Sequence, residues 1–197
     1  MKKIKILIAV LVTCISIVGC VVNGTQVFLS GNPKDAVFAD KESFIELNDG
    51  TIVEGKIKGD RISSYAVINR KRAAEMDNKS YPFDSYSALQ QNGKYFRKFK
   101  NRLVERIVKG NINVYRQEFT GGAGVTGGST VTSYGFYLQK GLKEALVDFD
   151  LKTLRNMVSD YAPAISLMDE YATLDKKQKR KEGDYYLNRV IAKYNDK

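Results

Sequence analysis

The feature that most constrains the fold is a change of hydrophobic period at Asp150. Before it, apolar residues such as Ile112 and Val114 alternate with polar neighbours, which is typical of strands. After it, apolar residues recur at helical spacing, at Leu151, Leu154, Val158 and Tyr161. Because strands come first and helices last, the sequence predicts an α+β fold: an antiparallel β-sheet or partial barrel over 43–150, followed by a C-terminal helical cap over 151–197 that packs on the sheet.

Two turn motifs predict β-hairpins within the first region. Asn48-Asp49-Gly50 separates candidate strands at 44–47 and 51–58, and Asn92-Gly93 separates candidate strands at 86–89 and 95–99. Such dipeptides suit type I′ turns, in which both central residues have positive φ. The remaining expected elements are short strands at 62–69 and 79–83, a helical turn at 73–77, strands at 112–119 and 133–139 joined by a glycine-rich loop at 120–132, and a last strand at 145–149.

The helical region carries its own start and stop signals. Asp150 is a suitable N-cap for a helix that begins at Leu151, because its carboxylate can accept from free backbone N–H groups. Pro163 either breaks this helix or starts a second one as its first residue. The stretch 176–181 is interpreted as a basic link. A final amphipathic helix follows, with apolar positions Leu187, Val190, Ile191 and Tyr194.

The N-terminus has the form of an export signal. Lysines at positions 2, 3 and 5 precede an uncharged apolar run at 6–18, as in a secretory signal peptide. The segment Ile17-Val18-Gly19-Cys20 resembles the lipobox of bacterial lipoproteins, whose leader is removed so that the cysteine becomes a lipidated N-terminus. We therefore expect a lipoprotein signal peptide over 1–19 and lipidation at Cys20. An uncleaved anchor remains an alternative, because 6–22 is near the shortest span of a bilayer, and so does an ordinary signal peptide.

The next segment, 20–42, is interpreted as a tether between the membrane and the folded region. It contains glycine, serine and proline and shows little periodicity, as linkers do. No acidic cluster follows Cys20, and Val21 stands directly after it. By analogy with lipoprotein sorting in Gram-negative cells, this favours the outer membrane.

Loss of the leader changes the charge and the cysteine count. Cys14 leaves with the leader and Cys20 becomes a thioether, so the mature chain forms no internal disulfide and depends on packing. Three of the 32 Lys and Arg residues also leave, against 22 Asp and Glu that stay, which lowers the net charge from +10 to +7. Such a charge is compatible with binding to lipid phosphates or anionic polymers, or with a basic surface that is only solvated. Nucleic acid is not an expected partner of an exported, tethered chain.

Several kinds of catalytic site are excluded by residue type. The chain has no histidine, which removes Ser-His-Asp and Cys-His systems and histidine-containing zinc sites. The run 122–127 matches the dinucleotide-binding spacing GxGxxG, with Glu144 and Asp148 at about the distance of the acidic partner. That motif requires a following helix, whereas 129–138 has a strand pattern, and Gly128 stands where a phosphate-loop lysine belongs. We interpret the run as a hairpin tip and predict no cofactor and no metal.

Carboxylates and cations leave further options open. Asp148 with Asp150, or Asp169 with Glu170, allow a glycan-active hydrolase, which needs two carboxylates about 5–10 Å apart. We interpret Asp150 as a helix cap and the others as solvated.

The strand at 95–100 interleaves rings and cations, as single-strand nucleic-acid binders do, and is interpreted as aromatic toward the core and basic outside. This strand or 176–181 is expected to touch lipid phosphates.

Several turn and strand motifs resemble one family. They are Leu47-Asn48-Asp49-Gly50-Thr51, Glu54-Gly55-Lys56-Ile57 and the stretches 109–115, 137–141 and 186–195. Together they are similar to exported envelope lipoproteins of Bacteroidetes that have no assigned activity. The resemblance implies a cell-envelope location and supplies no catalytic residues.

The sequence as a whole predicts a non-enzymatic, lipid-anchored protein of the bacterial envelope. Its expected role is that of an accessory or binding subunit of an outer-membrane assembly. The alternatives are the glycan-active hydrolase and a carrier that holds a small ligand inside a barrel.

Overall fold

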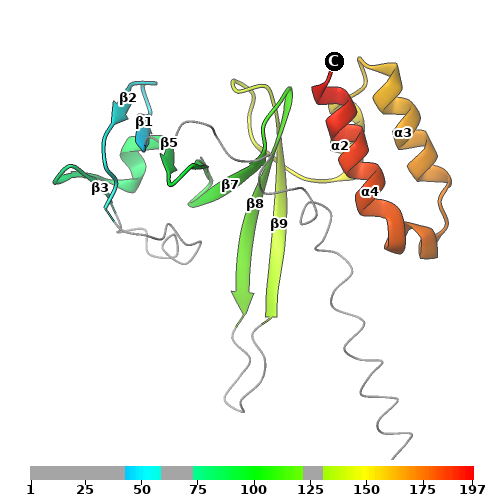
Figure 1. Ribbon diagram of the computed structural model, residues 1–197, viewed down its shortest axis with the longest axis horizontal. Coiled ribbons are helices and arrows are strands. Elements are labelled where there is room, and N and C mark those ends of the chain that lie inside the picture. Colours follow the sequence, from blue (N-terminus) through cyan, green and yellow to red (C-terminus); the bar gives the residue numbers. More distant parts are fainter. Residues whose placement is uncertain (1–42, 59–72, 122–130) are drawn as a thin grey trace, which may run out of the picture.

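An eight-stranded antiparallel sheet runs through the middle of the molecule in the computed structural model, which describes residues 43–58, 73–121 and 131–197 (Figure 1). The strand order is β10-β9-β8-β7-β6-β5-β1-β2, and β3 and β4 form a separate two-stranded sheet. Helices follow at the C-terminal end, so the α+β class predicted from the period change is confirmed. The strands are β1 (Phe44–Leu47), β2 (Ile52–Glu54), β3 (Ala74–Met76), β4 (Lys79–Tyr81), β5 (Tyr86–Gln91), β6 (Lys94–Phe99), β7 (Arg102–Val108), β8 (Ile112–Gly121), β9 (Val131–Lys140) and β10 (Val147–Asp148), and the helices are α2 (Leu151–Met157), α3 (Ala162–Thr173) and α4 (Lys176–Asn195).

The two predicted hairpins form, with different turns. Asn92 and Gly93 both have positive φ, at 53° and 73°, as a type I′ turn between β5 and β6 requires. Between β1 and β2 only Gly50 has positive φ, and the Asp49 carboxylate accepts from Thr51 N at 2.9 Å. That hydrogen bond lowers the pKa of Asp49.

The helical turn predicted at 73–77 is wrong. Residues 74–76 form β3, which pairs with β4 through a turn in which Asp77 and Asn78 have φ values of 48° and 65°. Asp and Asn tolerate this left-handed region better than other side chains, so Asp77-Asn78 acts as the hairpin signal. The strand predicted at 62–69 lies outside the described residues.

Strand β7 was not predicted, because its sequence does not alternate. Leu103 and Val104 are adjacent, and both are buried. Leu103 packs in the cluster beneath β1 and β5, while Val104 packs on the opposite face of the sheet. A strand that is buried on both faces lacks the period-2 signal.

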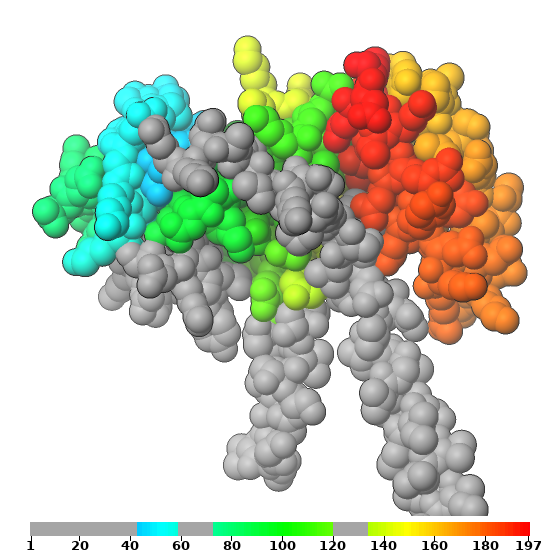
Figure 2. All heavy atoms as spheres, viewed as in Figure 1, coloured from blue at the N-terminus to red at the C-terminus, as the bar shows by residue number. Residues whose placement is uncertain are grey.

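One face of the sheet carries two apolar cores. At the β1–β5 end, Ile45 and Leu89 pack against Met76 and Tyr81 of the small sheet. At the β8–β9 end, the sheet contributes Ile112, Val114, Phe136 and Leu138, and the three helices cover them. Between the two cores the same face carries a charged strip, in which Glu105 bonds Arg116 at 3.0 Å and Lys94 at 3.4 Å. In Figure 2 the β1–β2 end (blue and cyan) and the helical end (orange and red) lie on opposite sides of the β8–β9 hairpin.

The helices are fixed by caps and close packing. The Asp150 carboxylate accepts from Thr153 N at 2.8 Å, which confirms the predicted N-cap of α2. Helix α3 begins at Ala162, with Pro163 in its first turn. The stretch 176–181, interpreted as a link, is instead the first part of α4, which Asp175 and Gln178 start with a capping box.

The glycine-rich loop is shorter than the predicted 120–132. The register continues to Thr120↔Thr132 and Gly121↔Val131, so each strand of this hairpin has ten residues. The last strand is also shorter than 145–149 and covers Val147–Asp148. Among the described residues, no helix is both long enough and apolar enough to span a membrane.

Candidate interaction surface

The β8–β9 hairpin extends beyond the strands that flank it. Strand β7 pairs with β8 as far as Arg116, and β10 pairs with β9 only at Tyr137 and Leu138. The register between β8 and β9 continues for five further residue pairs beyond Arg116, to Gly121↔Val131. In Figure 1 this two-stranded part runs below the rest of the sheet. Within the described residues, no further strand pairs with the outer edges of this part of the hairpin.

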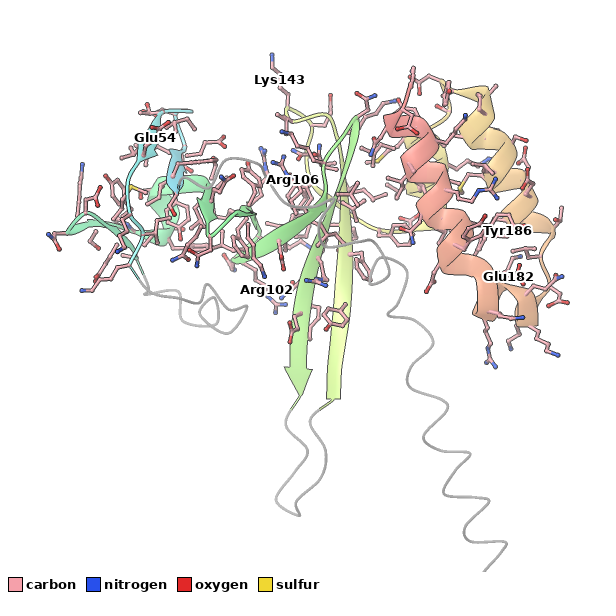
Figure 3. All side chains as sticks on the ribbon, in the orientation of Figure 1. Glu54, Arg102, Arg106, Lys143, Glu182 and Tyr186 are labelled. Carbon is pink, nitrogen blue, oxygen red and sulfur yellow. The ribbon has the colours of Figure 1, made fainter. Side chains whose placement is uncertain are left out.

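One face of the hairpin carries Phe119 stacked with Arg102. The Arg102 guanidinium lies 5.3 Å from the centre of the Phe119 ring, and Figure 3 shows Arg102 beside β8. Phe119 is 36% exposed. It lies over Gly135 of β9, where a Cβ would come within 3.0 Å of the ring. Glycine at 135 therefore lets the ring lie flat on the hairpin.

The other face repeats the arrangement with Tyr134 and Arg116. The Arg116 guanidinium lies 5.3 Å from the centre of the Tyr134 ring and is held by Glu105, which accepts from Arg116 Nη2 at 3.0 Å. We call Arg102, Arg116, Phe119 and Tyr134 the hairpin surface. Aromatic rings and arginines are enriched at protein–protein interfaces and carry much of their binding energy. The composition of the hairpin surface thus suits contact with another protein.

Beneath the hairpin surface, Phe99 and Tyr137 continue the aromatic row into the sheet. Their ring centres are 4.7 Å apart. The Tyr137 hydroxyl donates to Gln117 Oε1 at 2.9 Å, and burial raises the pKa of Tyr137. This row packs the base of the hairpin below the exposed Phe119 ring, whereas the half-buried Tyr134 on the other face packs against the helical core.

A buried polar network lies on the same face of the sheet as Tyr137. The Arg106 guanidinium carbon is 4.0 Å from the centre of the Tyr95 ring, and Tyr115 donates to Gln139 Oε1 at 2.8 Å. Gln139 Nε2 in turn donates to the carbonyls of Leu142 and Glu144 at 3.1 and 2.8 Å. Burial raises the pKa of Tyr95 and Tyr115 and lowers that of Arg106.

This network has a structural role. Tyr115 and Gln139 bond to each other, and Gln139 holds the segment after β9 across the sheet through two main-chain carbonyls. The tyrosines stay protonated at neutral pH, and their hydroxyl groups donate hydrogen bonds: Tyr115 to Gln139 Oε1 and Tyr95 to Glu46 Oε2 at 3.3 Å. The arrangement explains why polar side chains occupy the interior.

Three of the carboxylates singled out in the sequence have partners within the fold. Asp150 caps α2, and Asp148 lies 3.7 Å from Lys100 Nζ at the surface. Asp169 pairs with Arg155 at 2.7 Å, and Glu144 contributes a main-chain carbonyl to the Gln139 contact. Asp148, Asp150 and Asp169 thus each have a structural partner through their carboxylates, and the hydrolase alternative stays a prediction.

The interleaved strand at 95–100 differs from its expected pattern of rings inside and cations outside. Tyr95 is buried, yet Arg97 lies on the same face and donates to the Leu142 carbonyl at 3.3 Å. On the other face, the Lys98 amine lies 5.3 Å from the centre of the Phe83 ring. Both faces of β6 are partly covered, so rings and cations share each of them.

The signal peptide at 1–19, the tether at 20–42, the lipidation at Cys20 and the GxGxxG run at 122–127 lie outside the described residues. Among the residues that are described, no group of three or more Cys, Asp or Glu side chains could hold a metal ion. Arg102 and Phe119 were not singled out from the sequence, because β7 was missed and the loop was placed too early. The chain matches no protein-family model, no curated protein and no solved structure.

Proposed function

We propose that this protein is a non-enzymatic lipoprotein of the bacterial envelope, anchored at the outer membrane through Cys20, and that it binds a protein of an envelope assembly through its hairpin surface. The observation that carries the proposal is the hairpin itself: ten-residue strands that outrun their neighbours, with an arginine-stacked aromatic ring on each face. The lipobox-like segment before Cys20 supports the anchor.

The composition of the surface supports a protein partner. Aromatic rings give large contact areas at a small cost in side-chain entropy, and buried aromatic and arginine residues dominate measured interface energies. The free edges of the ribbon add backbone donors and acceptors that a partner strand can pair with. Both kinds of contact are available on the same projecting element.

The test is site-specific photocrosslinking in the native host. A benzophenone amino acid replaces Phe119 in the full chain, and adducts are isolated from detergent-solubilised membranes and identified by mass spectrometry. The matched control places the same group at Ile52, which is 49% exposed on β2 at the other end of the sheet. We expect one stoichiometric adduct from position 119 and none from position 52.

Two results would count against the proposal. Absence of a crosslinked or co-purified partner at position 119 would remove the binding role. An intact mass that shows a free Cys20 thiol, or a retained leader, would remove the anchor.

A further inference from the structure

The first two turns of α4 carry a cluster of cations at an unfavourable place. Lys176, Lys177, Arg180 and Lys181 are all exposed, and we call them the α4 cation cluster. The first turn contains no acidic residue. Backbone N–H groups give a helix N-terminus a partial positive charge, so cations there are repelled, whereas Asp and Glu are favoured.

The described part of the chain does not neutralise these charges. None of the ion pairs formed by the described residues includes a member of the α4 cation cluster. The four side chains line an open surface hollow of about 390 Å³. Lys179, between them in sequence, donates instead to the Ala172 carbonyl at 3.0 Å and lies over the Tyr171 ring. The N-cap Asp175 supplies one carboxylate at this end of the helix, but the four exposed cations exceed it, and a surface that breaks a local rule in this way points to a function.

An exposed aromatic ring continues the same helix. Tyr185 is one turn beyond Lys181 and 62% exposed, and the Arg189 guanidinium lies 5.2 Å from the centre of its ring. Tyrosine, with an apolar ring and a polar hydroxyl, is favoured where lipid headgroups meet water. Cations followed by an exposed tyrosine therefore suit a membrane surface.

We infer that the α4 cation cluster docks on the phosphate groups of anionic lipids in the membrane to which the protein is tethered. The inference rests on the proposed function, because an anchor at Cys20 keeps the domain beside such a surface. Clustered lysines and arginines near an anionic leaflet are attracted to its headgroups, and the attraction falls as salt rises. In Figure 1 the α3–α4 turn and the distal part of the hairpin lie toward the same, lower side of the molecule. Docking through α4 would thus turn the hairpin surface toward a partner in the membrane.

The test measures how close the α4 cation cluster lies to the bilayer in the full, lipidated chain. A dye is attached at Ala172→Cys, an exposed site whose carbonyl contacts Lys179, and an acceptor dye is placed on lipid headgroups. The protein is reconstituted in vesicles of phosphatidylcholine, with or without phosphatidylglycerol. We expect greater energy transfer with phosphatidylglycerol, and its loss at molar salt concentration.

Charge reversal provides the decisive comparison. The double substitution Lys177→Glu and Lys181→Glu should lower the ratio of membrane-docked to undocked protein by at least about twentyfold. Glutamate near a helix N-terminus is favourable, so the melting temperature should not fall, and misfolding cannot imitate the loss. The matched control reverses Lys56 and Lys143, both exposed and placed elsewhere in the fold. Figure 3 shows Lys143 at the top of the molecule and Glu182 of α4 near the bottom. The control should transfer energy as the parent does.

Three outcomes would overturn the inference: equal transfer in both kinds of vesicle, equal transfer by the charge-reversed variant and its parent, or crosslinking of the cluster to an acidic protein with no dependence on lipid charge. A failure of the proposed anchor would give a different experimental result. The chain without Ala172→Cys would then itself take up the thiol-reactive dye, because Cys20 would be unmodified.

Discussion

The Asn195 side chain pairs with the backbone of Ile112 as a neighbouring strand would. Asn195 Oδ1 accepts from Ile112 N at 2.7 Å, and Asn195 Nδ2 donates to Ile112 O at 3.0 Å. The last residue of α4 thereby satisfies both polar backbone groups of the first residue of β8. This bridge ties the helical region to the strand that forms the hairpin surface.

Replacement of Asn195 by alanine should lower the free energy of unfolding by about 2 kcal/mol, because it leaves a part-buried donor and acceptor on Ile112 without partners. Urea unfolding of the full chain measures the change. Asn156→Ala, at an exposed site on α2, is the matched control and should change the stability by less than about 0.5 kcal/mol. Equal effects of the two substitutions would show that the bridge is energetically unimportant.

Gly110 is required for the same bridge. A Cβ at position 110 would collide with the Asn195 amide group. Gly110→Ala should therefore destabilise the parent chain and have a much smaller effect in a chain that already carries Asn195→Ala. Simple addition of the two effects in a double-mutant cycle would contradict a shared origin.

The Asp160 carboxylate should make stability dependent on acid pH. It accepts from Lys197 Nζ at 2.8 Å and from the Tyr194 hydroxyl at 2.9 Å, and it pairs with Lys140 at 3.3 Å. These contacts hold the pKa of Asp160 below its ordinary value. A lowered pKa contributes stability above the unfolded pKa, near 3.9, and that stability is lost as the pH falls toward the folded pKa.

The variant Asp160→Asn should accordingly melt at a lower temperature than the parent at neutral pH, and the difference should shrink below about pH 4. Thermal unfolding by circular dichroism over a pH series measures this. Asp169→Asn, which removes one exposed ion pair with Arg155, is the control and should lower the melting temperature less. A difference that stays constant down to the lowest pH would argue against the assignment.

Gln139 should control the order of the segment after β9. It is fully buried, accepts from Tyr115 and donates to two carbonyls of that segment. Gln139→Leu removes all three hydrogen bonds, although the Leu142 carbonyl keeps its contact with Arg97, and should cost about 2–4 kcal/mol of stability. It should also speed tryptic cleavage after Lys143, which lies between the two carbonyls in sequence. Tyr115→Phe removes one donor and keeps both contacts to the segment, so cleavage should change little. Equal cleavage rates in Gln139→Leu and the parent would refute this role.

Local chemistry was sufficient to predict several elements. Asn92-Gly93 indicated a type I′ hairpin because both residues tolerate positive φ, and Asp150 indicated a helix start because its carboxylate caps free N–H groups. The alternation at Ile112 and Val114 correctly placed both side chains on one face, which the helices cover. Each of these signals acts within a few residues of sequence.

Other elements depended on contacts between distant residues. Strand β7 lost its alternation because Leu103 and Val104 are buried by different parts of the chain. We interpreted the start of α4 as a link because its run of lysines was the dominant pattern there. The capping box formed by Asp175 and Gln178 was missed. The stacking of Arg102 on Phe119 follows from the pairing of β7 with β8, which no local motif encodes.

The amino-acid sequence by itself determined that the strands precede the helices, that Asn92-Gly93 forms a tight turn and that Asp150 caps a helix, because periodicity, glycine and capping side chains act locally. The export signal stays a prediction from the sequence. Only the tertiary structure decided which side chains meet across the sheet, how far the hairpin outruns its neighbours, and that Asn195 closes on Ile112. The physical reason is that strand register and helix docking are chosen by burial summed over residues far apart in the chain.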